Sequence, residues 1–194
     1  MPGPKTKKDQ TRARMLEAAS ASFRANGYAG IGVDGIAKAA GVTSGAFYAH
    51  FGSKGRAFDA ALKAGLDEVI AAIPVFRAEH GKGWVEAFAD YYLGRPHRDD
   101  LSGGCAMTTL SPEVVRARPE VQAVYEEKMQ AIVGLVADGL NGGASKERRG
   151  RAWAMLGTLI GGLTASRAVN TQMLADEIAA SVKIAALTAA GATA

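Results

Sequence analysis

Apolar residues recur along almost the whole chain with the three- and four-residue spacing of amphipathic helices, and no stretch alternates as a strand would. The first helix is expected at residues 12–26 and ends at Gly27. Two shorter ones follow at residues 33–40 and 43–51, separated by a turn at Gly41. Because helical spacing dominates from end to end, we predict an all-α protein of about nine helices.

The later helices are equally regular in pattern. Ser53 is a suitable N-cap for a fourth helix, which we expect to stop at Pro74 because proline lacks a backbone N–H. Residues 94–103, rich in Gly, Arg and Asp, are expected to form a loop. The remaining helices are predicted at residues 84–93, 105–110, 119–140, 146–169 and 174–189.

Composition is ordinary for a folded protein, with 194 residues, 48% hydrophobic and 22% charged. A single cysteine excludes an internal disulfide framework and fits a reducing compartment. Residues 1–10 are polar and basic, unlike a signal peptide, and the longest apolar run, residues 152–165, is too short for a bilayer. We therefore expect a cytoplasmic protein with no membrane partner.

Positive charge is concentrated at the N-terminal end. Residues 1–56 contain nine Lys or Arg and three Asp or Glu. Residues 57–194 contain fourteen Lys or Arg and sixteen Asp or Glu. A basic end on a mildly acidic body is typical of a nucleic-acid-binding protein. A solvated tail is the alternative for Lys5–Arg14 alone. We predict a DNA-binding domain at 1–56 and a second domain at 57–194.

Residues 32–51 predict a helix-turn-helix, because two short helices joined by a glycine-containing turn have that form. The second helix of such a motif lies in the major groove of DNA. Phe47 and Phe51 are expected to face inward, and Tyr48 and His50 outward. The first turn, Ser44–Ala46, has few hydrogen-bonding groups, so specificity must depend on apolar contacts, backbone groups or DNA shape.

The stretch Ile36–Lys54 reads I-A-K-A-A-G-V-T-S-G-A-F-Y-A-H-F-G-S-K and resembles the N-terminal domain of TetR-family transcriptional repressors. The resemblance covers roughly residues 10–60. It departs from the family pattern at Gly32 and Gly55, where a hydroxyl and an acid are usual. It implies that Thr43, Tyr48, His50 and Lys54 hold the DNA backbone while Ser44–Ala46 face bases. The full set of expected DNA-binding residues is Lys8, Arg12, Val33, Thr43, Ser44, Gly45, Ala46, Tyr48, His50 and Lys54.

Catalytic and cofactor motifs are weak in this chain. The run Gly30–Gly35 matches G-x-G-x-x-G, but that fingerprint needs a preceding strand, and here a helix precedes it. In Gly41–Gly45 the serine is one position late for a nucleophile elbow. The three histidines have no metal-ligand spacing with Cys105. We expect neither an enzyme nor a cofactor or metal site.

The same resemblance implies an inducer pocket and a dimer. The pocket would lie among the fourth to eighth helices, and plain core is the favoured alternative for each of its candidate walls: Trp84, Phe88, Tyr91, Tyr92, Met107, Tyr125 and Met129. The last two helices would pair with their copies in a second chain, with Gly157 and Gly161 allowing close approach. The expected interface residues are Trp153, Leu156, Leu159, Ile160, Leu163, Ile178, Val182 and Ala186.

Cys105 has two interpretations. It stands at the expected start of a helix, where the helix end lowers a thiol pKa, and it resembles the Gly-Cys opening of family members that sense electrophiles. The alternative, which we favour, is a small buried packing residue.

The sequence thus predicts a homodimeric repressor of palindromic operator DNA, released by an unidentified small apolar or aromatic inducer or by an electrophile or oxidant at Cys105. The alternative is an architectural DNA-binding protein without an inducer.

Overall fold

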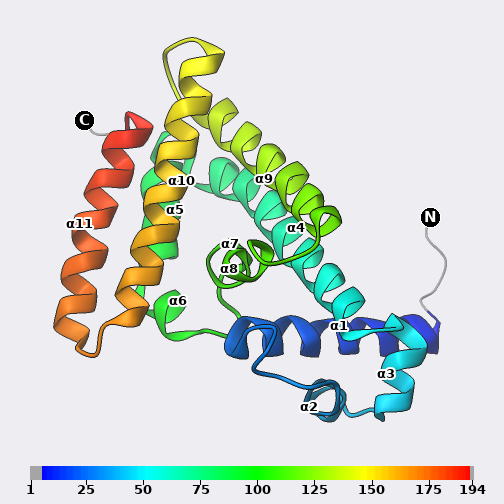
Figure 1. Ribbon diagram of the computed structural model, residues 1–194. Coiled ribbons are helices and arrows are strands. Elements are labelled where there is room, and N and C mark those ends of the chain that lie inside the picture. The colour runs from blue at the N-terminus through cyan, green and yellow to red at the C-terminus, as the bar shows by residue number, and fades with distance from the viewer. Residues whose placement is uncertain (1–5, 193–194) are drawn as a thin grey trace. The chain divides into compact units, whose positions relative to one another are not determined.

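The computed structural model describes residues 6–192, and every regular element in that range is a helix (Figure 1). The predicted all-α class is confirmed. The chain forms two compact units: the first holds the residues up to Gly65 together with Leu101–Gln122, and the second holds Leu66–Asp100 and the residues from Ala123 onward. Within the described range, no helix combines the length and apolarity required to cross a bilayer.

The first unit contains the predicted helix-turn-helix. It also contains residues 101–122, which the boundary expected at residue 56 assigns to the other domain. Lys5 lies outside the described residues. The helices of this unit are α1 (Lys7–Asn26), α2 (Val33–Ala39), α3 (Ser44–Phe51), the first part of α4 (Lys54–His80), α7 (Ala106–Thr109), α8 (Ser111–Val114) and the start of α9 (Pro119–Gly139).

Aromatic rings fill much of the interior of the first unit. Phe23 of α1 meets Phe58 of α4 edge to face at 5.4 Å between centroids, and Phe47 meets Phe51 within α3 at 5.2 Å. Such pairs add stability beyond the area they bury. The other buried apolar residues of this unit include Met15, Ala19, Ile36, Leu62, Met107, Leu110, Val114 and Val121.

The turn between α2 and α3 depends on a glycine. Gly41 has φ +65°, a left-handed conformation that side chains disfavour. Its N–H donates to the Lys38 carbonyl, and the Val42 N–H donates to the Ala37 carbonyl, as in a Schellman motif. Two carbonyls at the end of α2 are thereby satisfied, and the chain is directed into α3.

The second unit contains the rest of α4, the 3₁₀ turn Gly81–Gly83, α5 (Trp84–Leu93), α6 (Arg95–Asp99), the rest of α9, α10 (Ser145–Ala168) and α11 (Gln172–Ala190). Helices α10 and α11 lie side by side (Figure 1). A Cβ at Gly162 of α10 would overlap Val182 of α11, so glycine is required for that contact. Lys183 joins α11 to α5 through ion pairs with Glu86, at 3.1 Å, and Asp90, at 2.7 Å.

The prediction that α4 stops at Pro74 is wrong, because the helix continues to His80 with the proline inside it. Proline removes one backbone hydrogen bond, but tertiary contacts beyond it offset that loss. The Phe76 ring meets Phe88 of α5 at 5.3 Å, and Arg77 donates to the Leu135 carbonyl of α9 at 3.5 Å.

Two segments expected to lack helix contain short ones. Residues 94–103, predicted as a loop, include α6, which has a proline in its first turn. The side chains of His97 and Arg98 in α6 are buried, so packing stabilises a segment whose composition indicated a loop. Residues Ser111–Val114 form α8, where Ser111–Pro112 was expected to follow a helix end.

Candidate nucleic-acid interface

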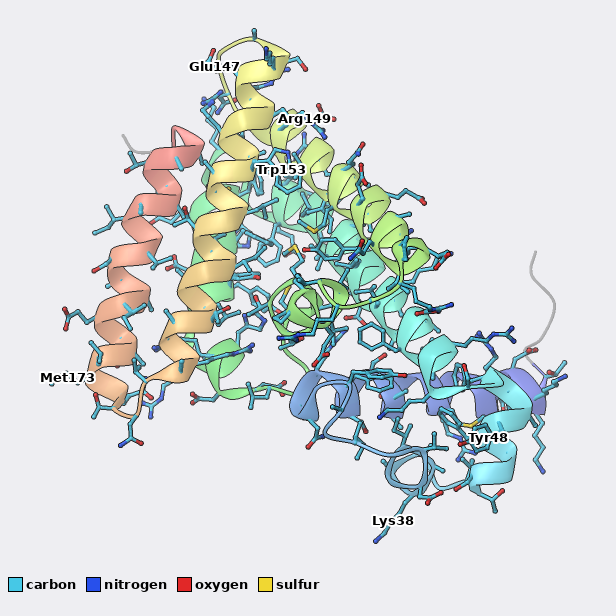
Figure 2. The ribbon with its side chains drawn as sticks, viewed as in Figure 1. Lys38, Tyr48, Glu147, Arg149, Trp153 and Met173 are labelled. Carbon is cyan, nitrogen blue, oxygen red and sulfur yellow. The ribbon has the colours of Figure 1, made fainter. Side chains whose placement is uncertain are left out.

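Helix α3 has one buried and one open face, as the sequence predicted. The Thr43 hydroxyl caps the helix by accepting the Ala46 N–H at 3.2 Å. Phe47 is fully buried and Phe51 is 5% exposed, so these rings hold α3 on α1 and α2. Tyr48 is 52% exposed (Figure 2). The position of the helix is therefore fixed from one side, leaving the other available.

The first turn of α3 is bonded to α2 through a residue that sequence reasoning missed. The Ser44 hydroxyl donates to a carboxylate oxygen of Asp34 at 2.5 Å. From the sequence, Asp34 entered only the charge count of residues 1–56. An acid in the first turn of α2, just before the recognition helix, could have indicated a polar partner for that helix. A carboxylate here repels phosphate but can accept the N4 amino group of cytosine.

Gly45 and Ala46 complete a first turn that carries almost no side-chain bulk. A Cβ at Gly45 would meet only the Thr43 hydroxyl, at an ordinary 3.8 Å, so the fold does not require glycine there. Gly45 is exposed and Ala46 half-buried. Because no side chain projects from Gly45, a duplex can approach the helix backbone closely.

The other helices of this unit carry cationic groups. The Arg12 guanidinium of α1 lies 5.4 Å from the Phe51 ring centroid, and the Lys54 ammonium lies 4.6 Å from that of Tyr28. Cation–π contacts of this kind position a charge while leaving its hydrogens available. Lys38 of α2, absent from the predicted site, is exposed at the end of its helix (Figure 2). Lys8 is exposed, whereas His50 and Val33 are half-buried.

The expected inducer-pocket walls are divided between the two units. Met107 belongs to the first unit, and the other six to the second. Trp84, Phe88, Tyr92 and Met129 are buried, Tyr125 is half-buried, and Tyr91 is 56% exposed. The Trp84 indole N–H donates to the Gly139 carbonyl at 3.2 Å, as a buried packing residue would.

Cys105 is half-buried and forms the N-cap of α7. The start of a helix here agrees with the sequence prediction, but α7 is only four residues long. A helix of one turn has a small macrodipole, so the argument for a lowered thiol pKa loses most of its physical basis. Among the described residues, no three His, Cys, Asp or Glu side chains are grouped to hold a metal ion.

The predicted dimer residues separate into three sets by their burial within the chain. Leu156, Leu159, Leu163 and Ala186 are buried within the chain, and Ile160, Ile178 and Val182 are half-buried. Trp153 is 42% exposed (Figure 2). Side chains already covered within one chain cannot form its outer surface, so the buried set belongs to the core of α10 and α11. The residues that α10 and α11 do expose include Ala154, Gly157, Gly161, Met173, Leu174 and Ile184.

Comparisons with known proteins agree with this geometry. The family model described as bacterial regulatory proteins, tetR family, matches residues 15–61. The HTH-type transcriptional repressor SCO4008 of Streptomyces coelicolor is 33% identical over 88 residues. That match spans 45% of this chain and 45% of the relative, so it covers less than half of either protein.

Solved structures extend the likeness of fold to nearly the whole chain. A TetR-family regulator from Agrobacterium tumefaciens has a TM-score of 0.76 at 15% identity, covering 92% of this chain and 98% of its own. SCO4454, a TetR-family regulator from Streptomyces coelicolor, has a TM-score of 0.73 at 22% identity. The match covers 93% of this chain and 96% of SCO4454. The reduced form of NemR from E. coli has a TM-score of 0.74 at 18% identity. The match covers 90% of this chain and 96% of NemR. At such low identity these matches establish the fold alone.

Proposed function

This chain belongs to the TetR family of bacterial transcriptional regulators, which are not enzymes, and we propose that it is a homodimeric repressor of operator DNA. The observation that carries the proposal is the open first turn of α3, in a unit whose other helices carry cations. Gly45 offers bare backbone where the fold would accept a side chain, and Arg12 and Lys54 lie on the same group of helices. This combination fits a duplex, whose phosphates bind cations while its base edges meet a close backbone. A repressor of this kind acts in the cytoplasm, on nucleoid DNA.

Homodimers of helix-turn-helix proteins bind pseudo-palindromes with half-sites about one helical turn apart, on the order of 34 Å, or a multiple of it. Sequencing the genomic fragments that the purified protein retains tests the proposal. We expect one enriched motif with a dyad. Fragments without a shared motif would instead favour an architectural DNA-binding protein, and a motif without a dyad would contradict the dimer.

A small apolar or aromatic molecule is the proposed trigger for release. It must bind the conformation that does not fit the operator more tightly, and the shift is limited by that difference in affinity. Modification of Cys105 by an electrophile or oxidant is the second candidate trigger. Cys105→Ser separates the two: if a quinone releases operator from the wild-type protein but not from this variant, the thiol is the sensor. An equal response, or none, leaves the small molecule as the trigger.

A further inference from the structure

The first unit contains a cavity of about 400 Å³, and none of the predicted pocket walls lines it. It lies among the turn after α1, the first turns of α4, and the segment that joins α8 to α9. Small-molecule sites typically measure roughly 300–1,000 Å³, so this cavity has room for a compact organic ligand. The residues that matter for its chemistry are Tyr28, Phe58, Asp59, Glu113, Ala117 and Val121.

The wall of the cavity combines aromatic rings with carboxylates. Tyr28 and Phe58 meet edge to face at 5.4 Å, and both line the cavity. Asp59 and Glu113 are half-buried in the same lining. Burial raises the pKa of Asp59, although its partner Arg118 acts in the opposite direction. The ion pair with Arg118 therefore compensates the Asp59 carboxylate only in part.

The positive groups of the lining lie at its outer edge. The Arg118 side chain is 66% exposed, against 37% for Asp59, and Arg116 is exposed as well. An anionic ligand would have to displace Asp59 from Arg118 and then lie beside two carboxylates. A cationic ligand would meet those carboxylates directly, with its apolar part against the rings. Arg118 could then turn into water at small cost, since exposed ion pairs contribute little to stability.

We propose that this cavity is a binding site for a small aromatic or aliphatic organic cation, paired with Asp59 and Glu113. The same two carboxylates connect α8 and α9 to the DNA-binding helices. Glu113 accepts the Tyr28 N–H at 3.2 Å, and Asp59 pairs with Arg118 at 3.2 Å. A cation that competes for both carboxylates loosens these connections. On the proposed function, which this step requires, the ligand thereby weakens operator binding.

Three probes that share one ring system test the charge preference: 2-naphthylmethylamine, 2-naphthylmethanol and 2-naphthoic acid. Titration calorimetry on the DNA-free protein is expected to rank the amine first, by about tenfold over the alcohol, as one charge-assisted hydrogen bond provides. Asp59→Asn should remove that advantage and leave alcohol binding unchanged. The matched control is Asp67→Asn, a carboxylate of the same helix that pairs with Lys128 at 2.7 Å and does not line the cavity.

Filling the cavity tests its location. Ala117→Trp should abolish binding of both amine and alcohol, and a thermal melt confirms that the variant folds. Equal affinities for amine and alcohol, or tightest binding of the acid, would overturn the cation preference. Unchanged binding to a folded Ala117→Trp protein would overturn the site, and if that variant does not fold, loss of amine preference in Asp59→Asn decides.

Operator release is measured separately, on a retained genomic fragment. The amine should release the fragment from wild-type protein and from Asp67→Asn but not from Ala117→Trp, which fills the cavity and keeps both carboxylates. This comparison also controls for the amine binding DNA itself. If the amine binds the protein but the fragment stays bound, the coupling fails while the site stands. If the protein retains no DNA, the proposed function fails, and calorimetry still decides the site.

Discussion

Helices α3 and α10 each have a face on which glycines have open space around them. A Cβ at Gly45 would meet only one hydroxyl at 3.8 Å, and a Cβ at Gly157 or Gly161 would meet nothing within 4 Å. Glycine within a helix costs roughly 0.5–1 kcal/mol relative to alanine. Packing within the chain requires none of the three, and on the proposed function the bare backbone lets a partner approach each face closely.

The surroundings of the two faces differ. Next to Gly45 lies the polar bond between Ser44 and Asp34, and the same unit carries the cations Arg12 of α1 and Lys54 of α4. Near Gly157 lies Trp153, and α11 exposes Ile184 to 65%. A basic, polar face suits a polyanion, whereas an apolar face suits a second protein surface. On the proposed function, bare backbone would serve close approach in both cases, and charge would decide the partner.

Charges placed on the apolar face should produce the largest effect. Trp153→Glu or Ile184→Glu should dissociate the dimer without unfolding the chain, because both residues are exposed. Loss of two-site binding should weaken operator affinity by about 10²-fold or more. Light scattering gives the oligomeric state, and fluorescence anisotropy gives the affinity.

Two variants separate interface from core. Val75→Glu introduces the same charge at a 51% exposed residue of α4. It should change neither the oligomeric state nor the operator affinity. Leu159→Glu should unfold the chain instead, since Leu159 is fully buried and an unpaired buried charge is costly. A folded wild-type monomer at micromolar concentration would contradict the dimeric account.

Removal of a cation from the polar face should produce the next largest effect. Lys54→Ala should weaken binding to all DNA sequences by about tenfold. The slope of log affinity against log salt should fall by roughly one per lost phosphate contact. Tyr48→Phe should act in the same direction but more weakly. Anisotropy at several salt concentrations measures both quantities, and an unchanged slope for Lys54→Ala would remove Lys54 from the interface.

Addition of a methyl group to the polar face should change affinity more than stability. Gly45→Ala fits the fold and should raise stability by at most about 0.5 kcal/mol, while operator affinity falls several-fold because the duplex can no longer approach as closely. Gly134→Ala in α9, where a Cβ also meets nothing within 4 Å, should raise stability and leave DNA binding unchanged. Equal affinities for both variants would mean that Gly45 does not contact DNA.

The smallest expected effect lies outside both faces, at His97. Burial lowers the pKa of this imidazole below its usual 6.5, although the Tyr92 carbonyl, which accepts from Nδ1 at 2.7 Å, acts in the opposite direction. As pH falls, His97 therefore takes up its proton in the unfolded chain at a higher pH than in the folded protein. The free energy of unfolding should fall as pH drops below about 6.5. His97→Gln should flatten this dependence in urea unfolding, whereas a change at the exposed His80 should not.

The helix-turn-helix could be predicted because its information is local. Thr43, Gly41 and the pair Phe47 and Phe51 follow capping, turn and periodicity rules that operate within a few residues. The continuation of α4 past Pro74 could not be predicted from the sequence, because contacts with distant helices offset the missing proline N–H. The Ser44 bond to Asp34 and the cavity at Asp59 likewise depend on residues that only the folded chain brings together. Sequence periodicity also could not distinguish the inner face of α10, with Leu159, from its outer face.

A hydroxyl-radical footprint on the enriched genomic site tests the central claim most directly. A dimer that inserts two α3 helices should protect two patches on one face of the duplex, about one helical turn apart or a multiple of it. The two patches should be related by the dyad of the sequence, and both should vanish together in Ile184→Glu. Continuous protection without a boundary, or a single patch that persists in Ile184→Glu, would contradict the account.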